Sequence, residues 1–292
     1  MLDLEEYVEQ AYFFQAIAQR ILDQVPLQDI MVQVREEILS TTNLPLAIDF
    51  LLGELKHLGV LAPAMQRLSH YFSPFQAFIM RQAENEKTKF DFRVALEVLR
   101  QEAAYRASGL TVQGLFLFQL ETICRNRLRY DHGLTAMAQD PSFDAAWREW
   151  ILTVRRQLGT IDLADLIYVR SQYYVNRRLR ERDAGTESGT RSDIPPVVLF
   201  GEKEGKIALA HRRKDPLYLF SSLQRHLGYP AVARRKPIDE TVALIPQLQR
   251  RVEQLETRVK LLEEDQRGGF DLTRFYQNAP RPIDPPGYEP DP

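Results

Sequence analysis

The sequence predicts a mainly α-helical protein with an N-terminal multi-helix bundle, a small β-hairpin plus helix module, and a C-terminal coiled-coil helix. Three observations predict this fold class. Apolar residues recur at helical spacing through residues 2–183, and no stretch there shows sustained alternation with a period of two. Two short β-favouring runs flank a polar turn after residue 193. A heptad repeat then fills residues 245–262, which implies a partner helix.

Residues 1–183 are predicted to form one all-α domain of about eight helices. Pro45 and Pro74 suit the first turn of a helix, because proline lacks an N–H group that is unpaired there anyway. Ser73 and Thr111 are N-cap candidates, since their side-chain oxygens can accept a free backbone N–H. These residues mark where several of the helices are expected to begin.

Two sets of side chains in this domain are expected to be buried. On the first helix, helical spacing selects Leu4, Val8, Ala11, Tyr12 and Ala18, although Gln15 and Gln19 interrupt this face. In the most hydrophobic segments, the same spacing selects Phe78, Leu96, Phe116, Leu120, Trp147 and Ile151. A sheet anywhere through residues 90–160 would contradict this interpretation.

Residues 184–193 have the composition of a flexible linker, rich in Gly, Ser and Thr and poor in apolar residues. The next segment, 194–237, is predicted to be a basic hairpin–helix module. Val197–Phe200 and Lys206–Ala210 favour β-structure and flank a glycine-bounded polar turn, which predicts a hairpin. Asp215 is placed to cap the helix that follows. An isolated hairpin is marginal in water, so this module must pack against another helix or the main domain.

Residues 238–267 are predicted to form a coiled coil that joins two copies of the chain. The seam consists of apolar residues spaced alternately three and four apart: Ile245, Leu248, Val252, Leu255, Val259 and Leu262. The β-branched residues Ile245, Val252 and Val259 occupy the a positions and leucines occupy the d positions, a pattern that favours two parallel strands. The seam covers only about three heptads, so folding of this helix back onto its own chain stays an alternative.

The charges beside the seam agree with a parallel dimer. Arg251 and Arg258 occupy g positions, and Glu256 and Glu263 occupy the e positions of the following heptads. In a parallel pair, these positions meet across the interface and form interchain ion pairs. An antiparallel pair would instead bring like charges together.

Residues 268–292 are predicted to be a disordered, proline-rich tail, with six prolines among the last thirteen residues. The stretch Pro-Pro-Gly-Tyr at 285–288 fits a PPxY pattern that aromatic-lined domains recognise. Four residues match such a pattern easily by chance, so the stretch alone predicts no partner.

Basic residues concentrate in the middle of the chain. Residues 120–236 carry 21 Lys/Arg against 14 Asp/Glu, whereas both flanking parts are acidic. The candidate anion-binding residues are Arg177, Arg178, Arg180, Arg212, Arg213, Lys214, Arg234, Arg235 and Lys236. Their neighbours Tyr173 and Tyr174 suit base stacking beside phosphate neutralisation, so nucleic-acid binding by segment 170–236 is one alternative. Solvated surface charge or docking of an acidic protein explains the same residues.

An enzymatic function is not favoured by the sequence. Glu54 and His57 have the Glu-x-x-His spacing of di-iron bundle proteins, but the chain lacks the second copy that such a site needs. A helical-bundle metalloenzyme is therefore kept only as an alternative. Cys124 is expected to be a small buried hydrophobe, because no base lies near it in the sequence. There is no phosphate-binding loop, dinucleotide fingerprint or nucleophile elbow, and we expect no cofactor or metal.

The remaining signals concern compartment and function class. The single cysteine excludes an internal disulfide and a multi-cysteine zinc site. The N-terminus lacks the pattern of a secretory signal, and the apolar run at 114–120 is far too short to cross a bilayer. We therefore expect a cytoplasmic, non-enzymatic interaction or scaffold protein that forms homodimers, contacts no membrane and docks an unidentified partner.

Overall fold

The computed structural model describes residues 2–85, 87, 90–183 and 197–234, together with Val252, Leu255, Glu256 and Val259. These residues form thirteen α-helices and one short 3-10 helix, and they contain no strand. In chain order the helices are α1 (Leu4–Arg20), η1 (Ile21–Asp23), α2 (Leu27–Glu37), α3 (Leu44–Leu58), α4 (Ala62–Arg67), α5 (Pro74–Glu84), α6 (Phe92–Ala107), α7 (Val112–Arg125), α8 (Tyr130–Ala138), α9 (Ala145–Gln157), α10 (Leu163–Val169), α11 (Gln172–Asp183), α12 (Glu202–Ala210) and α13 (Pro216–Leu227). The mainly α prediction is confirmed for this part of the chain.

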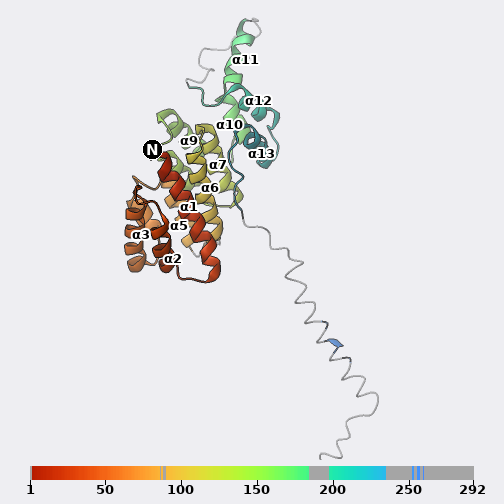
Figure 1. The fold of residues 1–292 in the computed structure, drawn as a ribbon. Helices are drawn as coiled ribbons and strands as arrows, with labels where there is room; N and C mark the ends of the chain where they lie inside the picture. Colours follow the sequence, from red (N-terminus) through yellow and green to blue (C-terminus); the bar gives the residue numbers. More distant parts are fainter. Residues whose placement is uncertain are drawn as a thin grey trace, which may run out of the picture. The chain divides into compact units, whose positions relative to one another are not determined.

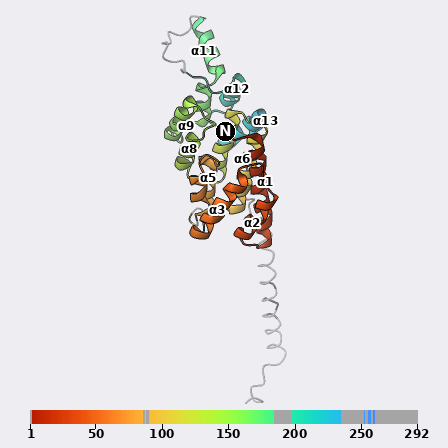
Figure 2. The same ribbon diagram turned by 60° about the vertical axis from the view of Figure 1, so that its left-hand side comes forward.

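Residues 1–235 form one compact unit, and residues 236–292 form a second. Within the first unit, α1 packs extensively along α6, α8 packs along α9, and α10 packs along α12. Figures 1 and 2 show α2 and α3 at one end of this bundle and α10–α13 at the other. None of the described helices combines the length and the apolar composition needed to cross a bilayer.

The core of the first unit contains a cluster of four large aromatic side chains. The ring of Phe116 on α7 lies 4.8 Å from that of Trp150 on α9. Phe200, which lies after residues 184–196, places its ring 5.3 Å from Trp147 and 5.2 Å from Trp150. The six predicted core residues are confirmed, because Phe78, Leu96, Phe116, Leu120, Trp147 and Ile151 are each at most 5% exposed.

Helix α1 buries a different face from the one that its apolar residues predict. Leu4, Val8 and Tyr12 are 62%, 48% and 40% exposed, so the prediction that they are buried is wrong. The buried residues of α1 are Glu6, Gln10, Phe13, Phe14, Ala16 and Ile17. The Tyr71 hydroxyl donates to the carboxylate of Glu6, and the Tyr71 carbonyl accepts from the amide of Gln10. These hydrogen bonds allow two polar side chains to lie in the core.

The predicted hairpin is also wrong, because its second strand lies within helix α12. Gly201 precedes the helix, and Glu202 and Glu204 lie in its first turn, where the helix dipole favours negative charge. Phe200, just before this glycine, forms an isolated parallel bridge with Ser171 in place of a hairpin partner. The N–H of Phe200 donates to the Arg170 carbonyl, and the Phe200 carbonyl accepts from the N–H of Gln172.

The C-terminal predictions fall largely outside the described residues. The linker at 184–193 and the tail at 268–292 lie outside them, and so does most of the coiled coil. Val252, Leu255, Glu256 and Val259 are described, and each is helical. The side chains of Val252, Leu255 and Val259 are 52%, 56% and 51% exposed.

Candidate functional site

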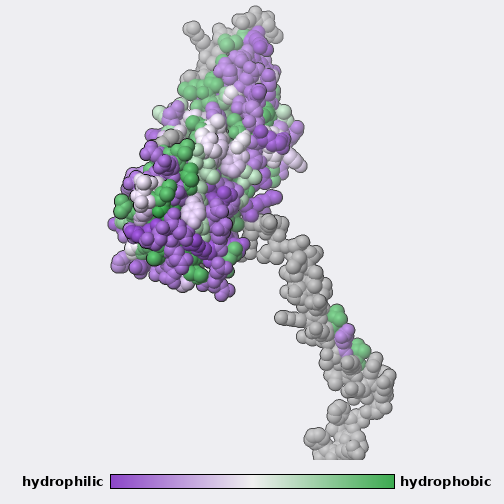
Figure 3. All heavy atoms as spheres, viewed as in Figure 1, coloured by the Kyte–Doolittle hydropathy of each residue, from purple (hydrophilic) through white to green (hydrophobic). Residues whose placement is uncertain are grey.

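Three of the predicted anion-binding arginines meet in one cavity of about 390 Å³, which we call the arginine–tyrosine pocket. Helix α10, helix α11 and the turn after α12 surround it. Its lining consists of Asp165, Tyr168, Val169, Tyr174, Arg177, Arg178, Glu181 and Arg212. On the face shown in Figure 3, hydrophilic residues cover much of the surface over α11 and α12.

Close packing of α12 against the start of α11 brings Arg212 to this pocket. The turn between α10 and α11 is held by Ser171, whose buried hydroxyl donates to the Tyr168 carbonyl at 2.6 Å. Gly205 of α12 lies directly on this turn, because a Cβ atom at Gly205 would fall 2.2 Å from the Ser171 Oγ. Asp162, the N-cap of α10, also accepts the N–H of Arg213 at 2.6 Å. The turn after α12 is thereby attached to α10.

Aromatic rings and carboxylates both face the arginines in the pocket. The guanidinium groups of Arg212 and Arg178 each lie 5.6 Å from a tyrosine ring, that of Tyr168 and that of Tyr174 respectively. The two rings are in turn edge to face, with centroids 5.3 Å apart. Such cation–π contacts hold planar guanidinium groups in fixed orientations.

Each of these arginines also faces a carboxylate. Arg212 forms an ion pair with Asp165. Arg177 binds Glu181 at 2.7 Å, and Arg178 lies 3.7 Å from the same carboxylate. Among the lining residues, three guanidinium groups therefore face two carboxylates, so the pocket is lined by charges of both signs.

The other predicted anion-binding residues do not line this pocket. Arg180, Arg213, Lys214 and Arg234 are exposed at other positions on the surface of the first unit. Arg235 and Lys236 lie outside the described residues.

Glu54 and His57, the two residues of the metalloenzyme alternative, do not line the arginine–tyrosine pocket. The Glu54 carboxylate binds Arg67 at 2.8 Å, and His57 on the same helix is exposed. Across the described part of the chain, no group of three or more His, Cys, Asp or Glu side chains could hold a metal ion. The metalloenzyme alternative gains no support from these residues.

Cys124 differs from the sequence prediction in its exposure. The residue is exposed at the end of α7, so the prediction that it is buried is wrong. Desolvation by surrounding protein atoms, together with the negative charge of Glu121, raises the pKa of the Cys124 thiol to about 11. Arg125 cannot activate this thiol effectively, because its guanidinium forms an ion pair with Glu121.

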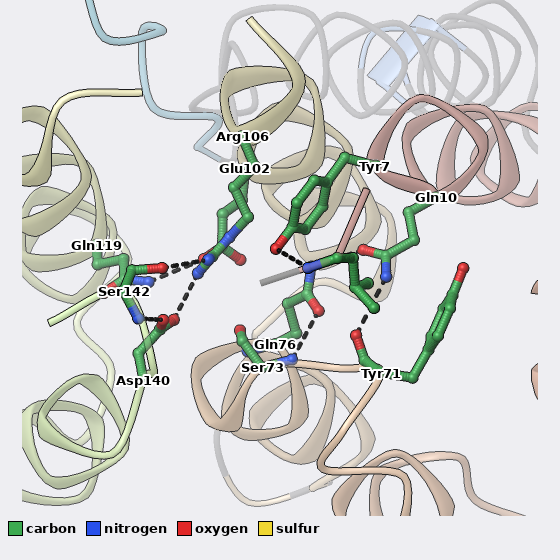
Figure 4. Close-up of polar contacts among 11 residues, drawn as sticks. Tyr7, Gln10, Tyr71, Ser73, Gln76, Glu102, Arg106, Gln119, Asp140 and Ser142 are labelled. Carbon is green, nitrogen blue, oxygen red and sulfur yellow. Dashed lines mark hydrogen bonds and ion pairs between the residues drawn. The ribbon is translucent and has the colours of Figure 1, made fainter. Parts of the chain in front are cut away.

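A second polar cluster, drawn in Figure 4, is sealed inside the bundle. Arg106 of α6 binds Glu102 of the same helix at 2.8 Å and Asp140, just after α8, at 2.5 Å. Gln119 of α7 donates to the same Glu102 at 2.8 Å. The Arg106 side chain is 2% exposed and both carboxylates are 0% exposed. This network has no access to solvent, and its role is to join α6, α7 and the segment after α8.

The two buried carboxyl groups respond to this environment in opposite directions. Burial raises the pKa of Glu102, and the nearby Asp140 charge opposes the effect of Arg106. Burial acts in the same direction on Asp140, but the Arg106 guanidinium and hydrogen bonds from Ser142 outweigh it and lower the pKa of Asp140. Sequence spacing could have suggested the pair Glu102 and Arg106, which are four residues apart on one helix. Nothing in the local sequence pointed to Asp140 or Gln119.

Comparison of the chain with protein-family models, curated proteins and solved structures finds no match. Its function is therefore inferred from its own residues.

Proposed function

We propose that this protein is a non-enzymatic interaction or scaffold protein, which dimerises through residues 245–262 and docks a protein partner at the arginine–tyrosine pocket. The observation that carries the proposal is the exposure of the described seam residues. Val252, Leu255 and Val259 fall at successive a, d and a positions, and each is more than half exposed in the single chain. Burial of such a side chain contributes about 1.5–3 kcal/mol, which a facing helix would supply.

The occupant of this apolar face is a second copy of the chain. The charges beside the seam are complementary to themselves, because Arg251 and Arg258 at g positions face Glu256 and Glu263 at the e positions of a parallel copy. Glu256 is exposed, as an e residue at the edge of a seam should be.

The chemistry of the arginine–tyrosine pocket supports a protein partner. Tyrosine and arginine are enriched at the centres of protein interfaces, where they combine apolar area with directed hydrogen bonds. The carboxylates of Asp165 and Glu181 would repel a continuous phosphate backbone, whereas a protein segment can present both signs of charge. Arg177, Arg178 and Arg212 are the residues that would contact it.

Light scattering of the full chain tests the dimer. We expect a dimer at micromolar concentration and a monomer for a chain truncated after Pro237, since residues 1–235 are compact without the seam. Leu255→Asp at a d position should dissociate the dimer, whereas Thr257→Asp at the outward f position of the same heptad should not. A monomeric full-length chain would remove the proposal.

Nucleic-acid binding is the second candidate, favoured by the stacking of Arg178 and Arg212 on tyrosine rings. Phosphate contacts release counterions, so binding to single-stranded RNA or DNA should weaken steeply as salt rises. Charge reversal at Arg212 and Arg213 should then weaken binding uniformly across sequences. Undetectable binding at low salt would eliminate this candidate.

A further inference from the structure

A second cavity, of about 350 Å³, lies between α5, α8 and the turn after α4, and we call it the α5–α8 pocket. Its floor is apolar, because Phe72, Ala77 and Phe78 line it and are 1%, 3% and 5% exposed. Its polar wall comes from Arg81 of α5 and from His132 and Thr135 of α8. No aspartate or glutamate is among its lining residues.

Arg81 brings a positive charge to this pocket that no carboxylate in the described part of the chain neutralises. Its guanidinium donates to the side-chain carbonyl of Gln66 at 2.5 Å, and no described carboxylate lies within ion-pair distance of it. Glu84, one turn further along α5, binds backbone N–H groups and not Arg81. Its carboxylate accepts the N–H groups of Leu61 and Ala62 at the start of α4. The arginine–tyrosine pocket differs, because each of its arginines faces a carboxylate.

The absence of a side chain at Gly133 sets the position of the α8 wall. A Cβ atom at this residue would fall 2.5 Å from the Ile123 Cδ1 and 3.1 Å from the Phe78 Cε1. Helix α8 therefore approaches α5 and α7 closely, and His132 and Thr135 line the same pocket as Arg81. The Thr135 hydroxyl is itself fixed, since it donates to the Asp131 carbonyl and accepts from Arg155.

We propose that the α5–α8 pocket binds a small organic carboxylate with an apolar body. The carboxylate pairs with Arg81, whose planar guanidinium matches carboxylate geometry with two parallel hydrogen bonds. The apolar body covers Phe72 and Phe78. A volume of about 350 Å³ is at the small end of ligand-binding pockets, so the ligand is a compact acid rather than a nucleotide. This site is independent of the dimer seam and of the arginine–tyrosine pocket.

Calorimetric titration of the full-length protein with 3-phenylpropionate tests this proposal, with 3-phenylpropionamide as the neutral analogue of the same shape. We expect the acid to bind and the amide to bind at least about tenfold more weakly, because a charge-assisted hydrogen bond is lost. Decanoate, a longer acid, tests whether the apolar body is aromatic or aliphatic. Absence of binding by both acids at millimolar concentration would overturn the proposal, and so would equal affinity for acid and amide.

Two matched variants locate the binding site. Arg81→Gln should weaken binding of the acid about tenfold or more and leave the already weak amide unchanged. Arg93→Gln removes the same charge from an exposed position on α6 that does not line the pocket, and should leave the affinity unchanged. Ala136→Leu narrows the pocket without altering charge and should weaken binding of both acids. Circular dichroism verifies that each variant is folded. Equal affinities for Arg81→Gln and Arg93→Gln would contradict the assignment to Arg81.

Discussion

Arg106 and Asp140 are 34 residues apart in the chain, yet a guanidinium nitrogen of the first lies 2.5 Å from a carboxylate oxygen of the second. Their side chains are 2% and 0% exposed. Because water cannot replace either partner, this contact fixes the segment after α8 against the C-terminal end of α6. It also makes the bundle sensitive to loss of one partner.

Arg106→Met should therefore destabilise the protein by about 3–5 kcal/mol, since it leaves two buried carboxyl groups without their counter-charge. Arg100→Met, on the same helix, is the matched control. Arg100 pairs with Glu97, but these side chains are 31% and 38% exposed, so this loss should be about 1 kcal/mol or less. Urea unfolding measures both values. Similar losses for the two variants would contradict a structural role for the buried pair.

Glu102 should give the bundle a distinct pH dependence. Burial raises the pKa of Glu102 in the folded state above the unfolded value of about 4.3. The folded state then holds a proton that the unfolded state has lost, so this group's contribution to stability falls as pH rises from about 4.3 to the raised folded pKa. Glu102→Gln removes this titration while keeping an oxygen acceptor, so its free energy of unfolding should decline less than that of the wild type through this window.

Urea unfolding at a series of pH values compares the free energy of unfolding of Glu102→Gln with that of the wild type. If the free energy of unfolding of Glu102→Gln changes with pH as steeply as that of the wild type, Glu102 is ionised in the folded state.

Gly205→Ala and Gly53→Ala should change stability in opposite directions, although both glycines lie inside helices. A Cβ atom at Gly205 would fall 2.2 Å from the Oγ of the buried Ser171, so this variant should lose about 1–3 kcal/mol. No atom lies within 4 Å of a Cβ at Gly53. There the helical preference of alanine should add about 0.5–1 kcal/mol. Thermal or urea unfolding of both variants measures the difference, and a stabilised Gly205→Ala would show that α12 does not pack closely on the turn between α10 and α11.

Helical periodicity predicted the helical class and the central core, because burial of large apolar side chains such as Phe116 and Ile151 stabilises the fold. It failed on α1, where Gln10 is buried and Leu4 is exposed. The reason is tertiary, since hydrogen bonds from distant residues satisfy the buried polar groups. The spacing of apolar residues along the chain carries no information about such distant partners.

The predicted hairpin failed for a related reason. Lys206–Ala210 contains residues that suit either a strand or a helix, and it lies in α12, where Gly205 packs on Ser171. Basic clustering drew attention to Arg177, Arg178 and Arg212, which the structure brings together around one pocket. It missed Arg81, because a single arginine on a helix gives no sequence signal until α8 closes a pocket beside it.

The orientation of the proposed dimer can be tested by exchanging its flanking charges. In a parallel pair, Arg251→Glu with Arg258→Glu replaces four attractive contacts by repulsive ones, because each g position faces a glutamate of the other chain. Exposed pairs contribute about 0.2–1 kcal/mol each, so we expect the dissociation constant to rise about tenfold or more. Adding Glu256→Arg and Glu263→Arg to the same chain should restore attraction and return the constant to near its original value.

An antiparallel pair predicts a different result from the same variants. There g faces g and e faces e, so like charges already meet and the first double exchange replaces one repulsion by another. Sedimentation equilibrium at about 0.05 M and 0.5 M salt measures the constants. The dissociation constants of the variants should differ less at the higher salt concentration, because screening weakens exposed ion pairs. A double exchange that leaves the dissociation constant unchanged at low salt would rule out the parallel register.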